Sequence, residues 1–381
     1  MGKKPDAGLK AGLSAFHKNV FEGIRDTHWR SLIYPGDHFP DYLFSHALSN
    51  LGVNAFSKKG TYIALGKYYR PSFQFINFSG PADNLRRLGT GALEAIANKL
   101  KIHGSIFIKP LSGECHSGLG VMRLSLSKNG VEISCSFKHD YEKMVKCLPS
   151  NFSFRAQGQN SVLINLQGIR LENVLAPLFH GHRGAFIVER EIHSPLFNGR
   201  KWEIRFIVHA DDKGPSVVSM AAKVANNKIA SNITSFGGKS VEPVEVVAKV
   251  YKSLYPGLSR IAVMRLTEEF VIKSREVAQG ATKKVNGYAE KLRAKYLPTF
   301  PKGGMNITEC GVDIMAELNS ITGRLEPKIV EFQYPDFGFR LDSDVLGTRI
   351  RHNNLISFIK RGKEKLNKYF NEKSPPQGVE P

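Results

Sequence analysis

The stretch from Ser105 to Leu124, SIFIKPLSGECHSGLGVMRL, most constrains how this chain can fold. An apolar run, Ile106 to Ile108, is followed by Lys109, by a turn rich in Gly and Ser, and by alternating residues from Val121. This pattern predicts a strand, a loop and a returning strand. Glycines let the backbone approach a ligand closely, successive N–H groups can bind an anion, and a lysine adds a positive charge. The stretch therefore favours phosphate binding, although a solvated turn can have the same composition.

Charge and composition narrow the class of protein. The 381 residues are 41% hydrophobic, which is enough for a buried core, and the net charge of +20 predicts an anionic partner. The basic residues form no long block, so a nucleic acid is not the expected partner. No run approaches the roughly 18 apolar residues of a membrane span, no signal peptide is evident, and we expect a cytoplasmic protein. The four cysteines show no C-x-x-C spacing, so we expect reduced thiols rather than a zinc site.

Hydrophobic periodicity predicts a mixture of helices and strands. The expected helices are 41–51, 92–100, 171–183, 243–254 and 265–296, and the segment 62–78 is broken at Pro71. The expected strands besides the hairpin are 131–137, 161–166, 185–192, 201–209, 216–225, 311–316 and 328–333, while 138–160 is expected to be irregular. In the strand 201–209, Glu203 and Arg205 share the face opposite Trp202.

Carboxylates near the end of the chain are the strongest chemical signal. Asp313 lies in one expected strand, and Glu331 and Gln333 lie two residues apart in the next, so that both point to one face. Oxygen ligands from neighbouring strands suit Mg²⁺ that is held partly by protein and partly by phosphates. The same residues would also fit the surface of an antiparallel hairpin. We prefer the metal hypothesis because a carboxylate among Ile, Val and Phe must find a partner.

The order of these parts resembles an ATP-grasp ligase. A lysine closes a strand before a glycine-rich loop, an acidic hinge follows, and then come a carboxylate and an arginine on one strand, an Asn before Gly-Gly, an Asp and a final E-x-Q. The chain is most similar to the branch with glutathione-synthetase-like ligases and the YheC/YheD proteins associated with endospore coats. The resemblance implies two α+β lobes with ATP between them. The implied parts are a divergent N-terminal region (1–100), an ATP-grasp domain (101–345), a C-terminal helix (346–371) and a disordered tail (372–381).

The resemblance also implies a role for each matching residue. ATP would be bound by Lys109, by the loop residues Ser112, Gly113, Gly118, Gly120 and Val121, by the adenine hinge Glu189, Arg190, Glu191 and Ile192, and by Glu203 near the ribose. The catalytic residues would be Arg205, Lys223 and Asn232, and the metal ligands would be Asp313, Glu331 and Gln333.

This sequence departs from the family pattern in three places. Lys223 stands where the family usually has an arginine, and Gln333 replaces the Asn of E-x-N, which keeps the carbonyl oxygen but adds a methylene. The lysine that contacts the phosphates from an upstream position has no clear counterpart, and Lys58, Lys59 and Lys67 remain candidates.

The activity implied by the resemblance is an ATP- and Mg²⁺-dependent carboxylate-amine ligase that acts through an acylphosphate, with two metal ions. Its partners would be anionic small-molecule or peptide carboxylates and amines. The alternatives are a catalytically silent nucleotide-binding or structural ATP-grasp protein, phosphoryl transfer to another acceptor, and a basic protein that binds polyanions.

Overall fold

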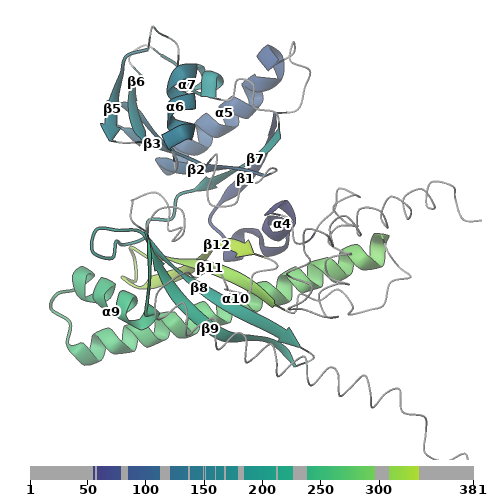
Figure 1. Ribbon diagram of the computed structural model, residues 1–381, viewed down its shortest axis with the longest axis vertical. Coiled ribbons are helices and arrows are strands. Elements are labelled where there is room, and N and C mark those ends of the chain that lie inside the picture. The colour runs from purple at the N-terminus through teal and green to yellow at the C-terminus, as the bar shows by residue number, and fades with distance from the viewer. Residues whose placement is uncertain are drawn as a thin grey trace, which may run out of the picture.

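A computed structural model describes most of the chain between residues 55 and 333. The described residues are 55, 58–78, 85–111, 121–135, 138–148, 150, 152–158, 160–166, 169–178, 184–211, 213–225, 238–296 and 309–333. They form two antiparallel sheets with helices packed against them, so the expected α+β fold is confirmed (Figure 1). The expected helices 41–51 and 346–371 and the tail lie outside these residues.

The first sheet has seven strands in the order β1-β7-β2-β3-β4-β6-β5. They are β1 (Phe73–Phe78), β2 (Ser105–Pro110), β3 (Met122–Ser127), β4 (Gly130–Cys135), β5 (Phe154–Gly158), β6 (Ser161–Asn165) and β7 (Gly184–Arg190). The predicted hairpin is confirmed, since β2 pairs with β3 and Ile106 lies opposite Leu124. Because β2 also pairs with β7, the start of the expected adenine hinge runs beside the strand that carries Lys109.

Three helices pack on one face of this sheet, namely α5 (Leu85–His103), α6 (Lys138–Cys147) and α7 (Leu171–Leu178) (Figure 1). In α5, Ile96 and Leu100 lie one turn apart and are fully buried, together with Ile106 and Ile108 of β2. Burial of each such side chain stabilises the fold by about 1.5–3 kcal/mol. The alternation in β2 therefore turns Lys109 to the opposite face, away from this core.

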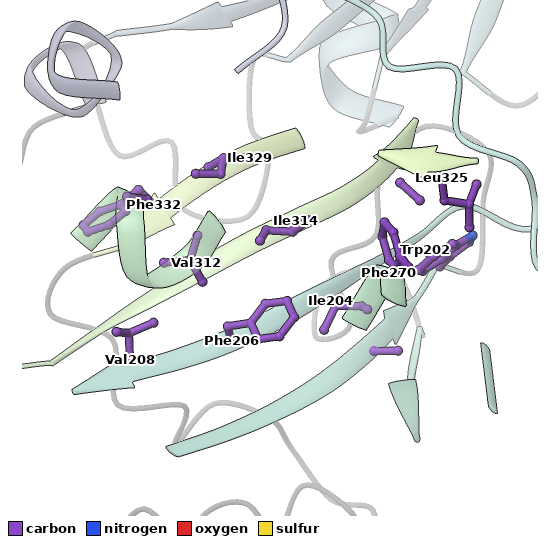
Figure 2. Close-up of a cluster of buried hydrophobic side chains, with 14 of the residues drawn as sticks. Trp202, Ile204, Phe206, Val208, Phe270, Val312, Ile314, Leu325, Ile329 and Phe332 are labelled. Carbon is purple, nitrogen blue, oxygen red and sulfur yellow. The ribbon is translucent and has the colours of Figure 1, made fainter. Parts of the chain in front are cut away.

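The second sheet has five strands in the order β10-β9-β8-β11-β12. They are β8 (Trp202–Asp211), β9 (Gly214–Val224), β10 (Lys239–Val241), β11 (Glu309–Leu318) and β12 (Leu325–Gln333), and the helices α9 (Pro243–Leu254) and α10 (Arg260–Tyr296) join β10 to β11. The predicted alternation in β8 is confirmed, because Trp202, Ile204 and Phe206 are fully buried in one core. Figure 2 shows these side chains along β8, with Trp202 beside Phe270 of α10. The opposite face of the sheet carries the polar candidate residues.

The helix α4 (Lys58–Tyr69) contacts both sheets (Figure 1). Leu65 belongs to the core of the second sheet, whereas the Tyr62 ring packs edge-on against Phe73 of β1 with ring centroids 4.9 Å apart. The helix is kinked at Gly66, where φ is 59°. The sequence showed no readable motif in this segment, yet it connects the two halves of the fold.

The expectation of an irregular segment over 138–160 was wrong, because this segment contains α6 and β5. The helix buries Met144, and β5 lies at the edge of the sheet, where only β6 pairs with it. An edge strand with exposed side chains shows little hydrophobic alternation, so tertiary pairing and not local pattern forms it. None of the helices described is both long and apolar enough to cross a membrane.

Candidate active site

Lys109 and Glu189 form the centre of the candidate phosphate site on the first sheet. Lys109 Nζ lies 2.5 Å from Glu189 Oε2, and the Glu189 side chain is 3% exposed. Burial disfavours the ammonium form of Lys109, but the Glu189 carboxylate outweighs burial and raises the pKa of Lys109 above its ordinary value. The lysine is therefore a fixed positive charge at the end of β2, beside the glycine loop.

Of the three candidates for the upstream lysine, the structure places Lys58 beside this strand. Lys58 Nζ donates a hydrogen bond to the carbonyl oxygen of Pro110 at 3.3 Å, one residue after Lys109. Lys59 and Lys67 are exposed. Lys58 is thus the one of the three candidates that contacts the end of the strand that carries Lys109.

The hinge residues carry their own buried charges. Glu191 accepts hydrogen bonds from Lys201 Nζ at 2.7 Å and from Arg123 Nε at 2.8 Å. Burial favours the neutral acid, yet Lys201, followed by Arg123, holds the pKa of Glu191 below its ordinary range. Arg190 makes a two-point ion pair with Glu317 of β11, in which Arg190 Nη2 lies 2.9 Å from Glu317 Oε2. Ile192 is buried.

Four charged side chains lie on the face of the second sheet opposite its core. Arg205 Nε and Nη2 donate to the two Asp313 oxygens at 2.7 and 2.6 Å, and Lys223 Nζ donates to Asp313 Oδ2 at 2.7 Å. Lys223 also forms an ion pair with Glu203. The strand register sets this cluster, because Arg205 lies opposite Asp313 and Glu203 lies opposite Lys223. All four residues are less than 10% exposed.

The charge balance of this cluster determines its pKa values. Burial alone would raise the pKa of Asp313, but Arg205 and Lys223 lower it to about 2 from its ordinary value of 3.8. Burial and Arg205 oppose the charge on Lys223, whereas Asp313 and Glu203 raise its pKa. Two carboxylates therefore hold two cations on the sheet face, and these partners favour the charged forms of Asp313 and Lys223.

The three expected metal ligands lie together on this face. In the β11–β12 ladder Asp313 lies opposite Glu331 and Gly311 lies opposite Gln333, so the three side chains are cross-strand neighbours. Asp313 is buried, Glu331 is exposed and Gln333 is half-buried. Their carboxylate and amide oxygens are ligands that suit Mg²⁺. However, three N–H donors already contact Asp313, and the described residues contain no cluster of three His, Cys, Asp or Glu side chains arranged to hold a metal.

Several expected residues fall outside the described part of the chain, namely Ser112, Gly113, Gly118, Gly120 and Asn232. Val121 is described and lies half-buried just before β3.

Some contacts in the site were not expected from the sequence. Lys201 begins the alternation of β8 on the side of Glu203 and Arg205, so the period of the strand could have identified it. Tyr62 and Arg70 contact Glu189, more than a hundred residues away, and no local pattern indicates such a contact.

These features define a protein with two α+β lobes, in which charged residues of the first sheet adjoin a face of the second sheet that carries paired carboxylates and cations. The family model for YheC/D-like ATP-grasp proteins matches residues 90–279. The resemblance to YheC/D-like ATP-grasp proteins is therefore confirmed over these residues, and the ATP-grasp fold expected from the sequence is confirmed. None of the curated proteins matches the chain.

Three solved structures similar to this chain have distant sequences. They are D-alanyl-alanine synthetase A from Vibrio cholerae O1 biovar eltor str. N16961 (11% identity, TM-score 0.35, 79% of this chain and 64% of that chain), the D-cycloserine synthetase DcsG (10%, 0.38, 83% and 77%), and the L-amino acid ligase from Bacillus licheniformis (14%, 0.34, 83% and 55%). This chain thus spans less than two thirds of the length of the first and the third. At these TM-scores the similarities carry no argument about activity.

Proposed function

We propose that this protein is an ATP-dependent ligase that joins a carboxylate to an amine through an acylphosphate. The observation that carries the proposal is the ion pair between Arg190 and Glu317. Arg190 belongs to the expected adenine hinge, and Glu317 lies on β11, on the same side of that strand as Asp313. The pair thus supports a single site in which the phosphate lysine and the charged face of the second sheet act on one nucleotide.

Each lobe would bind a different part of ATP. Lys109 and Lys58 would contact the phosphates, and the loop over 112–121 would cover them. In the hinge, the N–H of Arg190 donates to Ser72 and that of Glu191 donates to Ser105. Because these two N–H groups already donate hydrogen bonds within the protein, we propose that the backbone from Ile192 onward binds the edge of the adenine. Glu203 would then lie near the ribose.

The proposed reaction has two steps. A substrate carboxylate oxygen attacks the γ-phosphorus, and the bond from that phosphorus to the ADP oxygen breaks, which gives an acylphosphate and ADP. An amine nitrogen then attacks the acyl carbon, phosphate leaves with the bonding electrons, and loss of the amine proton gives the amide. Arg205, Lys223 and Asn232 would stabilise the oxyanions that develop, and loss of one such preorganised group costs about 3–4 kcal/mol in the transition state.

Magnesium fits the oxygen ligands Asp313, Glu331 and Gln333, which would hold two ions together with the phosphates. When bound, Mg²⁺ would offset the negative charge of the phosphates. The substrates would be anionic small molecules or peptides, because the chain carries a net charge of +20.

A second candidate is a nucleotide-binding ATP-grasp protein without turnover. The contacts of Asp313 with Arg205 and Lys223 favour it, because a metal ion must compete with both cations for the carboxylate. Gln333 in place of Asn also favours it. Phosphoryl transfer to an acceptor other than a carboxylate would use the same nucleotide site.

Calorimetric titration with a non-hydrolysable ATP analogue, with and without Mg²⁺, tests the proposal. We expect Mg²⁺-dependent binding that is lost or strongly weakened in Lys109→Ala and unchanged in Lys249→Ala, which removes an exposed lysine of α9. Phosphate release with pairs of acids and amines then separates a ligase from a silent protein. If the wild-type protein does not bind the analogue, the nucleotide site is wrong and polyanion binding becomes the better hypothesis.

A further inference from the structure

In the Glu189 carboxylate, one oxygen accepts hydrogen bonds and the other accepts none. Oε2 accepts hydrogen bonds from Lys109 Nζ at 2.5 Å and from Tyr62 Oη at 3.0 Å. Oε1 is buried and has no hydrogen-bond partner, and Arg70 Nη2 lies 3.6 Å away from it. That distance makes an ion pair but exceeds the roughly 2.7–2.9 Å of a charge-assisted hydrogen bond.

Arg70 is the complementary group, because it has unused donors. Its side chain is 1% exposed, and the guanidinium carbon lies 3.3 Å from the centre of the Tyr62 ring. Nη2 donates to the carbonyl oxygen of Val330 at 2.6 Å, whereas Nε and Nη1 are buried without a hydrogen-bond partner. A buried guanidinium with unpaired N–H groups is costly, so a nearby acceptor that became available would attract it.

We propose that Arg70 replaces Lys109 as the hydrogen-bond partner of the Glu189 carboxylate when nucleotide phosphates draw Lys109 away. We call this replacement the exchange. This inference rests on the proposed function, in which Lys109 contacts ATP. A phosphate bound by Lys109 competes with Glu189 for the ammonium group, and a buried carboxylate that loses its cation is strongly destabilised. Arg70 needs to close a gap of less than about 1 Å to form the charge-assisted hydrogen bond and offset that loss.

The same residue connects the two lobes. Arg70 follows α4 directly, and its Nη2 holds the carbonyl of Val330, the residue before the proposed metal ligand Glu331. A movement of the guanidinium toward Glu189 therefore changes a contact to β12. Arg70 is thus a positioning residue that acts through Lys109 and β12.

A double-mutant cycle between Arg70 and Glu189 tests the exchange, with the Kd of a non-hydrolysable ATP analogue as readout. In Arg70→Met, Lys109 is the one remaining cation against Glu189, and we expect binding about tenfold weaker, the equivalent of one charge-assisted hydrogen bond. In a Glu189→Gln background the carboxylate no longer holds Lys109, so Arg70→Met should change the Kd less than about twofold. A merely structural role predicts the same loss in both backgrounds and would overturn the proposal.

Three further measurements separate a specific loss of binding from misfolding. Arg70→Lys keeps the charge and should recover most of the affinity that Arg70→Met loses, while Arg265→Met, which removes an exposed arginine of α10, should bind as wild type does. A crystal structure of the wild-type protein with the analogue needs no variant. It should show an Arg70–Glu189 hydrogen bond and Lys109 on a phosphate, and Lys109 still bonded to Glu189 would overturn the exchange.

The outcomes also separate this inference from the proposed function. If wild-type protein does not bind the analogue, the nucleotide site itself is wrong. If the wild type binds and Lys109→Ala does not, but the cycle shows no coupling between Arg70 and Glu189, then Lys109 contacts the nucleotide without the exchange.

Discussion

Arg190 at the end of β7 and Glu317 on β11 form a two-point ion pair between the two sheets. The side chains are 23% and 16% exposed, so solvent screens the pair only in part. Arg190 also lies between Glu189 and Glu191, whose carboxylates bind Lys109 and Lys201. The contact between the lobes and the charges of the hinge are therefore parts of one network.

Glu317→Gln tests the contribution of this pair. The variant keeps the shape of the side chain but leaves the half-buried Arg190 without its counter-charge. We expect the free energy of unfolding to fall by about 1–3 kcal/mol, between the values for exposed and buried pairs. Denaturant unfolding measures it. Glu269→Gln removes a carboxylate paired with the exposed Arg265 and Arg324, and it should cost less than about 1 kcal/mol. Equal losses of unfolding free energy in the two variants would show that the Arg190–Glu317 pair stabilises the protein no more than an exposed ion pair does.

The cluster around Asp313 predicts a dependence of stability on acid pH. Its folded pKa of about 2 lies below the ordinary 3.8, so the stabilisation is complete above pH 4 and is lost as the pH falls toward 2. The part that is lost amounts to about 2 kcal/mol. Unfolding of wild type and Asp313→Asn, followed between pH 2 and 6, should differ less at the acid end. A constant difference over this range would contradict the pKa assignment. Glu142→Gln on α6 is the surface control.

Glu331→Ala tests the proposed metal site. Because Glu331 is exposed on β12, its truncation should leave the free energy of unfolding within about 0.5 kcal/mol of wild type. We expect the Mg²⁺-dependent part of nucleotide binding and any phosphate release to be lost. Titration with the ATP analogue at several Mg²⁺ concentrations measures the effect, and Glu276→Ala on the exposed side of α10 is the control. Retained Mg²⁺ dependence would mean that the ligands lie elsewhere.

Two glycines of α10 test how α4 packs between the lobes. A Cβ at Gly280 would lie 2.7 Å from Tyr69 Oη, whereas a Cβ at Gly287 would meet no atom within 4 Å. Gly287→Ala should therefore stabilise the protein by about 0.5–1 kcal/mol through helix propensity. Gly280→Ala should lose this gain and be destabilised by about 1–2 kcal/mol, because the added methyl group overpacks the contact with α4.

The variant Tyr69→Phe provides the control for Gly280→Ala. Removal of the hydroxyl leaves the nearest ring atom at 3.4 Å from the added Cβ, so the double variant should recover most of the lost stability. Denaturant unfolding measures each step. If Gly280→Ala stabilises as Gly287→Ala does, α4 does not pack on α10 in the way described.

Local pattern was sufficient where a strand or helix buries one regular face. The alternation of β8 correctly separated Trp202 from Glu203 and Arg205, and the hairpin of β2 and β3 follows from the apolar residues on both sides of the glycine loop. The family resemblance also came from ordered motifs in the sequence. The pattern failed at β5, where pairing at the edge of the sheet replaces hydrophobic periodicity, and it also missed the short, polar helix α6.

The sequence by itself thus determined the mixture of helices and strands, the resemblance to ATP-grasp proteins and the candidate residues of the site, because these depend on side-chain chemistry, on the order of motifs and on periods of two or 3.6 residues. Only the tertiary structure decided which charges meet. Sequence spacing says nothing about Lys58 beside Pro110, Arg190 on Glu317, or Arg70 between Glu189 and Val330, since strand order and lobe packing create these contacts. Burial increases the free-energy cost of losing such a contact, because an ionised group removed from water must find a partner within the fold.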